Sequence, residues 1–232
     1  MDVVYICRGG DNEELRYSIR SVVKNFPHSK IWVVGDKPDW YIGNFIAVEQ
    51  RSIQKYNRAR NNLKAIISSK EISDPFVLMN DDFYIINKID RLPVLYGGTL
   101  EEKIEIQYSK GASNSYVRLL ESTQSWLVKH YKVKNPINYE LHVPMEMTKD
   151  GLKKALVSPG LWRSTYGNIV YTQGEVNMQD VKVFLPGTVE YNRSYNIDNP
   201  IYDYVSSNDD SFDIVYDKIL KDNFSKATAY EK

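Results

Sequence analysis

Cysteine and histidine are scarce in this chain of 232 residues, which contains one cysteine and three histidines. A single cysteine, Cys7, cannot form an internal disulfide, and this suits a reducing compartment. Because Cys7 lies within an apolar run, we expect a buried, unreactive thiol rather than a nucleophile. The small number of thiol and imidazole groups also argues against a structural zinc site.

Net charge is absent as well, because 30 Lys and Arg residues balance 30 Asp and Glu residues. No overall field would draw the chain to nucleic acid or to an anionic membrane. We find no basic leader and no apolar stretch of membrane-spanning length, so we expect a soluble, cytoplasmic protein. The 42% hydrophobic content excludes a disordered composition and is ample for a large core.

Short apolar runs alternate with helical patterns through the first 80 residues. Strands are predicted over 3–7, 31–34, 45–48 and 76–79. One helix is predicted to begin after a cap at Asp11 or Asn12 and to end at Pro27, and a second is predicted over 56–69. This order predicts an α/β fold with a mainly parallel central sheet and helices on both faces. Helices are also expected over 115–131, 148–157 and 213–220. We expect one domain over 1–232, with the α/β core in 1–90 and an elaboration in 91–232.

Three adjacent polar residues, Asn80-Asp81-Asp82, directly follow the last of these strands. Taken alone, the tripeptide is most simply a solvated turn. At the carboxyl end of a strand in an open α/β sheet, however, ligands commonly bind, and paired carboxylates can hold a divalent cation on a diphosphate. Ser207-Asn208-Asp209-Asp210, in the second half, is most simply a solvated turn.

Two further segments have the composition of phosphate-binding sites. Arg8 and Gly9 follow the first strand, where a glycine allows the backbone to approach a nucleotide, although a full dinucleotide fingerprint is absent. Asn57, Arg58 and Asn61 lie at a basic, amide-rich helix start, and helix N-termini with arginine suit phosphates. A solvated amphipathic face explains the second segment equally well.

The segment Asp11-Asn12-Glu13-Glu14-Leu15-Arg16-Tyr17-Ser18, after a strand and a glycine loop, closely resembles the signature of the Stealth family. That family comprises sugar-phosphate transferases of bacterial capsule synthesis and the related enzyme that tags lysosomal glycoproteins. Further segments resemble its other elements in the same order, namely Asn80-Asp81-Asp82, Leu141-His142-Val143-Pro144-Met145, Trp162-Arg163-Ser164 and residues 223–231.

The resemblance implies a nucleotide-sugar transferase fold of the GT-A type and a nucleotide diphosphate sugar as donor, most simply a UDP-sugar. An acceptor hydroxyl, on a glycan or another molecule, would receive sugar-1-phosphate. Asp81 and Asp82 would hold Mg²⁺ or Mn²⁺, Asn80 would orient the site, and Arg163 would bind phosphoryl oxygens. His142 is the favoured base and Asp11 the alternative. Arg8, Gly9, Arg16, Asn57, Arg58 and Asn61 are the candidate substrate-binding residues.

Three other readings remain open. A glycosyltransferase of the same fold would move the sugar itself and release nucleoside diphosphate, and the contraction of the family's opening loop to Arg8-Gly9-Gly10 keeps this reading open. A nucleotide-sugar-binding module without activity is the second alternative. A nucleic-acid acceptor suits the compact size, but the sequence contains no basic stripe to support it.

Overall fold

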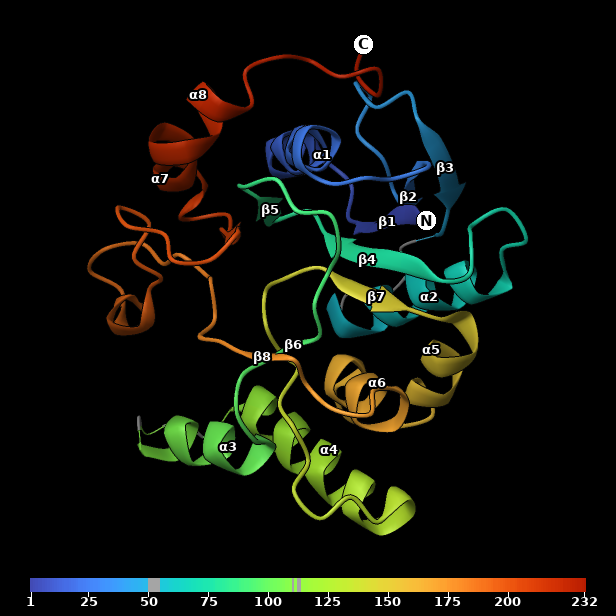
Figure 1. Cartoon of the computed structure of the whole chain (residues 1–232), viewed down its shortest axis with the longest axis vertical. Coiled ribbons are helices and arrows are strands. Elements are labelled where there is room, and N and C mark those ends of the chain that lie inside the picture. The colour runs from blue at the N-terminus through green and yellow to red at the C-terminus, as the bar shows by residue number, and fades with distance from the viewer. Residues whose placement is uncertain (50–54, 110, 112–113) are drawn as a thin grey trace. The chain divides into compact units, whose positions relative to one another are not determined.

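The computed structural model describes residues 1–49, 55–109, 111 and 114–232, and the chain divides into two compact units (Figure 1). The first unit contains residues 1–92, 142–147 and 181–232, whereas the second contains 93–141 and 148–180. The chain first passes from one unit to the other between residues 92 and 93, close to the predicted end of the α/β core. Three stretches that are far apart in sequence therefore build the first unit.

A five-stranded sheet forms the centre of the first unit (Figure 1). Its pairings are parallel except that the edge strand β7 runs antiparallel to β4. The mainly parallel sheet was predicted, whereas β7 was not. In spatial order the strands are β3 (Asn44–Ala47), β2 (Ile31–Gly35), β1 (Asp2–Cys7), β4 (Phe76–Asn80) and β7 (Met145–Met147).

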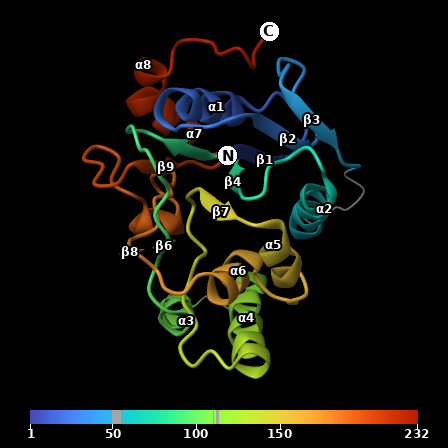
Figure 2. The same cartoon turned by 45° about the vertical axis from the view of Figure 1, so that its right-hand side comes forward.

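Helices α1 (Glu13–Asn25) and α2 (Lys55–Ser68) lie on opposite faces of this sheet (Figures 1 and 2). The crossover through α1 carries the chain from β1 outward to β2, and the crossover through α2 carries it back past β1 to β4. Because parallel crossovers are right-handed, two crossovers that travel in opposite directions place their helices on opposite faces. The predicted α/β arrangement is confirmed.

The apolar stripe of α1 faces the core, where Leu15, Ile19 and Val22 are fully buried. The side-chain oxygen of Asn12 caps the helix by accepting a hydrogen bond from the amide of Leu15 at 3.0 Å. Of the two predicted capping residues, Asn12 therefore serves and Asp11 does not. Asn12 adopts a left-handed backbone conformation (φ 46°), which asparagine tolerates better than most residues.

The strand order changes direction at β1, because the chain builds β2 and β3 on one side of it and then β4 on the other. In open α/β sheets, ligands bind in the crevice outside the carboxyl ends of the strands at such a switch point. Ile6 pairs with Asn80 in register, so Arg8 and Asp82 both leave the sheet at this edge. The topology thus directs attention to the carboxyl ends of β1 and β4.

The later residues of the first unit add a two-stranded sheet, in which β5 (Phe83–Ile85) pairs antiparallel with β9 (Tyr204–Ser206). The predicted helical spacing over 213–220 is confirmed, although as a short α-helix followed by a π-helical turn. The helical elements here are the 3₁₀ helix Val189–Arg193, α7 (Phe212–Val215), the π-helix Tyr216–Leu220 and α8 (Lys221–Asn223).

The second unit is mainly helical. It contains α3 (Leu100–Ser109), α4 (Ser115–Tyr131), α5 (Lys149–Ala155) and α6 (Trp162–Val170), with a short parallel pair of strands, β6 (Leu95–Tyr96) and β8 (Val176–Asn177). The sequence predicted α4 and α5 but neither α3 nor α6. Among the described residues of both units, no helix is both long enough and apolar enough to cross a membrane.

Candidate functional site

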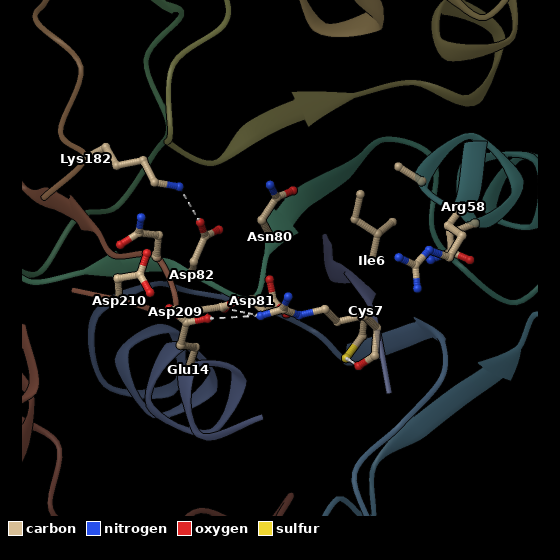
Figure 3. Close-up of a pocket in the computed structure, with 14 residues that line it drawn as sticks. Ile6, Cys7, Glu14, Arg58, Asn80, Asp81, Asp82, Lys182, Asp209 and Asp210 are labelled. Atoms are coloured by element: carbon tan, nitrogen blue, oxygen red, sulfur yellow. Dashed lines mark hydrogen bonds and ion pairs between the residues drawn. The ribbon is translucent and has the colours of Figure 1, made fainter. Parts of the chain in front are cut away.

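A cavity of about 420 Å³ opens at the carboxyl ends of β1 and β4 (Figure 3). Its lining comes from the ends of both strands, the first turn of α1, the start of α2 and two later segments of the first unit. The lining residues are Ile6, Cys7, Arg8, Glu14, Arg58, Ala59, Asn62, Asn80, Asp81, Asp82, Lys182, Asn208, Asp209 and Asp210. The cavity therefore coincides with the switch point of the sheet.

Asp81 lines this cavity and is hydrogen-bonded to Asn12, the residue that caps α1. The side-chain amide of Asn12 donates a hydrogen bond of 2.8 Å to Asp81 Oδ2 and also approaches the sulfur of Cys7 at 3.4 Å. Burial raises the pKa of Asp81 to about 6, and the neighbouring charge of Asp82 adds to the rise. The hydrogen-bond partner of Asp81 is thus the neutral amide of Asn12, which leaves the negative charge of the carboxylate without a directly bonded cation among the described residues.

Asp82 has a cationic partner on one oxygen only. Lys182 Nζ lies 3.0 Å from Asp82 Oδ2, and both side chains are about 15% exposed or less (Figure 3). Asp82 Oδ1 and Asn80 Oδ1 are buried and accept no hydrogen bond from any residue that the structure describes. Buried oxygens without a donor are rare, and a bound water molecule or ion can supply the missing contact.

Glu14, in the first turn of α1, is a third carboxylate of the cavity and is only 7% exposed. The hydroxyl of Ser207 donates to Glu14 Oε1 at 2.6 Å, and Arg8 lies 3.9 Å from Glu14 Oε2. Burial raises the pKa of Glu14 to about 7, and the charges of Asp82 and Asp81 add to the rise. A carboxyl group of this kind can exchange a proton near neutral pH.

Positive charge reaches the cavity from three elements. Arg8 follows β1, Arg58 lies near the start of α2, and Lys182 precedes the β9 region. Arg8 forms an ion pair with Asp209 at the exposed side of the cavity. Among the described lining residues, these three cations accompany five carboxylates, so the cavity has both the cations that bind phosphate and the acids that bind a metal.

Glycine is required at position 35 near this edge of the sheet, where φ is 124°, whereas at position 9 an added side chain would displace only the side chain of Asp36. A Cβ atom on Gly9 would lie 2.3 Å from Asp36 Oδ2, and one on Gly35 would lie 2.3 Å from the carbonyl oxygen of Cys7. Gly9, Arg8 and Glu14 also line a neighbouring hollow of about 460 Å³. The predicted approach of the Gly9 backbone to a nucleotide stays a prediction.

Seven of the predicted site residues are not among those that line the cavity. They are Asp11, Arg16, Asn57, Asn61, His142, Gly9, which lines the neighbouring hollow, and Arg163, which belongs to the second unit. Asp11 is exposed, and its carbonyl oxygen accepts a hydrogen bond from Trp40 Nε1 at 2.6 Å. The ring of His142 lies edge-on to Phe83, with 6.0 Å between the centroids. Asn57 and Asn61 are exposed on α2, whereas Asn62 on the same helix is buried in the cavity wall.

Arg16 packs at the C-terminal tail instead. Its guanidinium lies over Trp40 at 4.5 Å, donates to Glu13 at 2.9 Å and lies 3.5 Å from Glu231. The buried carboxylate of Glu231 also accepts two hydrogen bonds from Arg20, at 2.9 and 2.6 Å. These contacts give Arg16 a structural environment that links α1 to the end of the chain.

Arg163 belongs to the second unit, within α6, and is only 6% exposed. Its Nε atom donates to the carbonyl oxygen of Tyr139 at 3.5 Å, and its guanidinium carbon lies 5.6 Å from the ring centre of Trp162. Burial of an arginine requires such partners. Its role in catalysis stays a prediction.

Sequence reasoning missed Glu14, Lys182 and the segment Asn208-Asp209-Asp210 as lining residues. Two signals were present. Asn208-Asp209-Asp210 repeats the tripeptide Asn80-Asp81-Asp82. Lys182 lies between Val181 and Val183, whose side chains are buried. Alternation around a strand-like segment places the middle side chain on the opposite face from its neighbours. The predicted solvated turn over residues 207–210 is confirmed for Asp209 and Asp210, which are exposed although they also border the cavity, and is wrong for Ser207, which is fully buried.

The oxygen atoms of Asn80, Asp81 and Asp82 are of the kind that a magnesium or manganese ion prefers. No group of three or more Asp, Glu, His or Cys side chains in the described part of the chain is arranged to hold a metal by itself. Mg²⁺, however, usually binds through one or two carboxylates together with substrate phosphates and water. The unsatisfied oxygens of Asp82 and Asn80 are hard donors of the kind this requires.

Neither a family model nor a curated protein matches this chain.

Proposed function

We propose that this protein is a metal-assisted transferase that uses a nucleotide diphosphate sugar and moves sugar-1-phosphate to an acceptor hydroxyl. The observation that carries the proposal is the cavity at the switch point, where Arg8, Arg58 and Lys182 surround the Asp81–Asp82 pair. Phosphates need the cations, and a bridging divalent ion needs the carboxylates. The resemblance of five segments to the Stealth family and its GT-A-type fold supports the same reaction.

In this proposal, the three cations bind the diphosphate and neutralise the charge that develops on its oxygens. Asp82 and Asn80 would hold Mg²⁺ or Mn²⁺ through their unsatisfied oxygens, and Asp81 would contribute its charge from beside them. The bound metal would polarise the phosphoryl oxygens. Asn12 orients Asp81, so the helix cap and the site depend on one side chain.

The acceptor oxygen would form a bond to the phosphorus next to the sugar, and the bond from that phosphorus to the oxygen of the nucleoside monophosphate would break. The proton of the hydroxyl must pass to a base. His142 and Asp11 are the candidates from the family resemblance. Glu14 is a third candidate, because it lines the cavity and its pKa is raised to about 7.

Glycosyl transfer is the second candidate reaction, and one observation favours it. Neither His142 nor Asp11 lines the cavity, whereas five carboxylates do. A glycosyltransferase would break the bond between the sugar carbon and the phosphate oxygen and would release nucleoside diphosphate. The two reactions therefore differ in the nucleotide that leaves, whichever acceptor is used.

A donor screen tests both reactions. Purified protein would be incubated with Mn²⁺ or Mg²⁺, candidate acceptors and a panel of UDP-, GDP-, CMP- and dTDP-sugars, and the released nucleotide would be identified by mass spectrometry. We expect nucleoside monophosphate from a diphosphate donor. Asp82→Asn should abolish the release, whereas Asp90→Asn, an exposed acid-to-amide control in the same unit, should leave it unchanged.

Release of nucleoside diphosphate would replace sugar-phosphate transfer with glycosyl transfer. Release of monophosphate that persists undiminished in Asp82→Asn, and that appears without acceptor, would indicate a contaminating nucleotide-sugar pyrophosphatase. If no donor binds to the wild-type protein or is consumed by it, the proposed function is wrong.

A further inference from the structure

Lys182 is fixed in place by the backbone on both sides of it. The amide of Ser206 donates to the carbonyl oxygen of Val181 at 3.0 Å, and the amide of Val183 donates to that of Ser206 at 2.8 Å. Val181 and Val183 are buried at 0% and 2% exposure, which directs Lys182 away from them and into the cavity wall. The ammonium group therefore reaches Asp82 from a backbone segment that hydrogen bonds hold in place on both sides.

The Lys182–Asp82 pair is incomplete in a specific way. Lys182 Nζ donates a hydrogen bond of 3.0 Å to Asp82 Oδ2, whereas Asp82 Oδ1 is buried and accepts no hydrogen bond from a described residue. A largely buried ion pair gains most when the remaining lone pairs are also satisfied. Asp82 is consequently neutralised by Lys182 but retains an open oxygen for a second cation.

Charge in the cavity limits what Lys182 can do for a substrate. The described lining carries five carboxylates and three cations, and Arg8 is already paired with Asp209. A diphosphate adds further negative charge, so Lys182 can serve it only when another cation replaces Lys182 at Asp82. A divalent metal at Asp82 would provide that replacement, because it binds carboxylate oxygen and phosphate together.

We propose that Lys182 is an internal counter-ion that neutralises Asp82 in the resting protein, competes with the divalent metal for that carboxylate, and turns to the substrate diphosphate once the metal has bound. This inference rests on the proposed function, because it assumes a metal at Asp82. It adds an ordered coupling, since metal binding releases the lysine that the nucleotide then uses. Metal and nucleotide should therefore bind cooperatively.

Substitution of Lys182 should have opposite effects on the affinity for the metal and on the affinity for the nucleotide. Without nucleotide, Lys182→Met should bind Mn²⁺ about tenfold more tightly than the wild type, because a competitor is removed. With saturating Mn²⁺, the same variant should bind UDP about tenfold more weakly, because a phosphate ligand is lost. Mn²⁺ affinity would be measured from the electron paramagnetic resonance signal of free Mn²⁺, and UDP affinity by isothermal titration calorimetry.

Three variants complete the experiment. Lys182→Arg retains the charge and should keep Mn²⁺ affinity within about threefold of wild type. Lys182→Gln repeats the test should Lys182→Met fail to fold as judged by circular dichroism. Lys88→Met removes an exposed lysine of the same unit and should change neither affinity.

Equal or weaker Mn²⁺ binding by Lys182→Met, beside clear binding by the wild type, would overturn the inference and leave the proposed metal site standing. Unchanged UDP affinity would also overturn it, because the lysine would then have no role toward the diphosphate. Absence of Mn²⁺ binding in wild type and variant alike would overturn the inference together with the metal in the proposed function.

Discussion

The tripeptide Asn-Asp-Asp occurs twice in this protein, and the two copies border the same cavity in different environments. Asn80-Asp81-Asp82 ends a buried strand, and the Asp82 side chain is 15% exposed. Asn208-Asp209-Asp210 forms a turn, in which the Asp209 side chain is 60% exposed and Asn208 bonds with Ser211. Identical residues thus occupy a buried site and a solvated rim.

The difference shows how context turns a common turn sequence into a candidate metal site. Water stabilises the carboxylates of Asp209 and Asp210, so their proximity has little energetic consequence. Asp81 and Asp82 lack that solvation, and burial raises the pKa of Asp81 to about 6. A buried acid pair that remains in a fold needs compensation, which Lys182 and Asn12 supply in part and a bound cation would complete.

The largest expected effect separates the two copies directly. Asp82→Asn should lower turnover at least a hundredfold, because the metal and the phosphates lose their shared ligand, whereas Asp210→Asn should change it less than about tenfold. Turnover would be measured under limiting Mn²⁺ with the donor that the screen identifies. Equal losses in the two variants would contradict the distinction between a buried site and a rim.

A comparable effect tests whether the chemistry extends beyond the cavity. His142→Ala and Arg163→Ala should each lower turnover by roughly a hundredfold if His142 is the base and Arg163 binds the phosphoryl group. Arg163→Lys should recover part of the loss, and circular dichroism would check the fold because Arg163 is buried. Wild-type rates in both alanine variants would confine the chemistry to the cavity and assign the base to Glu14.

A smaller effect concerns stability and pH. The pKa of Glu14 rises from 4.5 to about 7 on folding, so its protonation favours the folded state below pH 4.5 and this contribution is lost as the pH rises through 7. Glu14→Gln should therefore be more stable than the wild type at pH 8, by about 1–3 kcal/mol, and nearly equal to it at pH 4. Thermal unfolding at the two pH values measures this, and a difference independent of pH would contradict it.

The smallest effect concerns the exposed copy of the tripeptide. Asp209→Asn removes the ion pair with Arg8, whose side chain is 45% exposed. Because exposed ion pairs contribute little, the free energy of unfolding should change by less than about 1 kcal/mol. Urea denaturation measures the change. A loss of several kcal/mol would show that the rim is part of the structural core of the site.

Much of the first unit could be predicted because its signals are local. β-branched apolar runs indicate buried strands, and the amphipathic spacing of Leu15, Ile19 and Val22 indicates α1. The alternation of strands and helices then predicts a parallel sheet, whose strands have their carboxyl ends at one edge. That β1 and β4 are neighbours in it follows only from the structure. The sequence also predicts Asn80-Asp81-Asp82 at the carboxyl end of its strand and Arg8 directly after the first strand, and it indicates Arg58 as a candidate phosphate-binding residue.

The remaining site residues depend on contacts between distant parts of the chain. Lys182 and Asp82 are separated by 100 positions, and Ser207 and Glu14 by 193. No periodic pattern specifies such pairs, since they follow from the way the later segments pack beside β5. The edge strand β7 was missed for a related reason, because three residues with the pattern Met-Glu-Met are too short to distinguish from a loop.

The central claim is that Asp82 and the surrounding cations form one site for a metal and a nucleoside diphosphate. Isothermal titration of UDP into the wild type and into Asp82→Asn, each with and without Mn²⁺, tests this most directly. We predict that Mn²⁺ strengthens UDP binding at least tenfold in the wild type and has no effect in Asp82→Asn. UDP binding that is absent from the wild type, or equally strengthened by Mn²⁺ in both proteins, would contradict the claim.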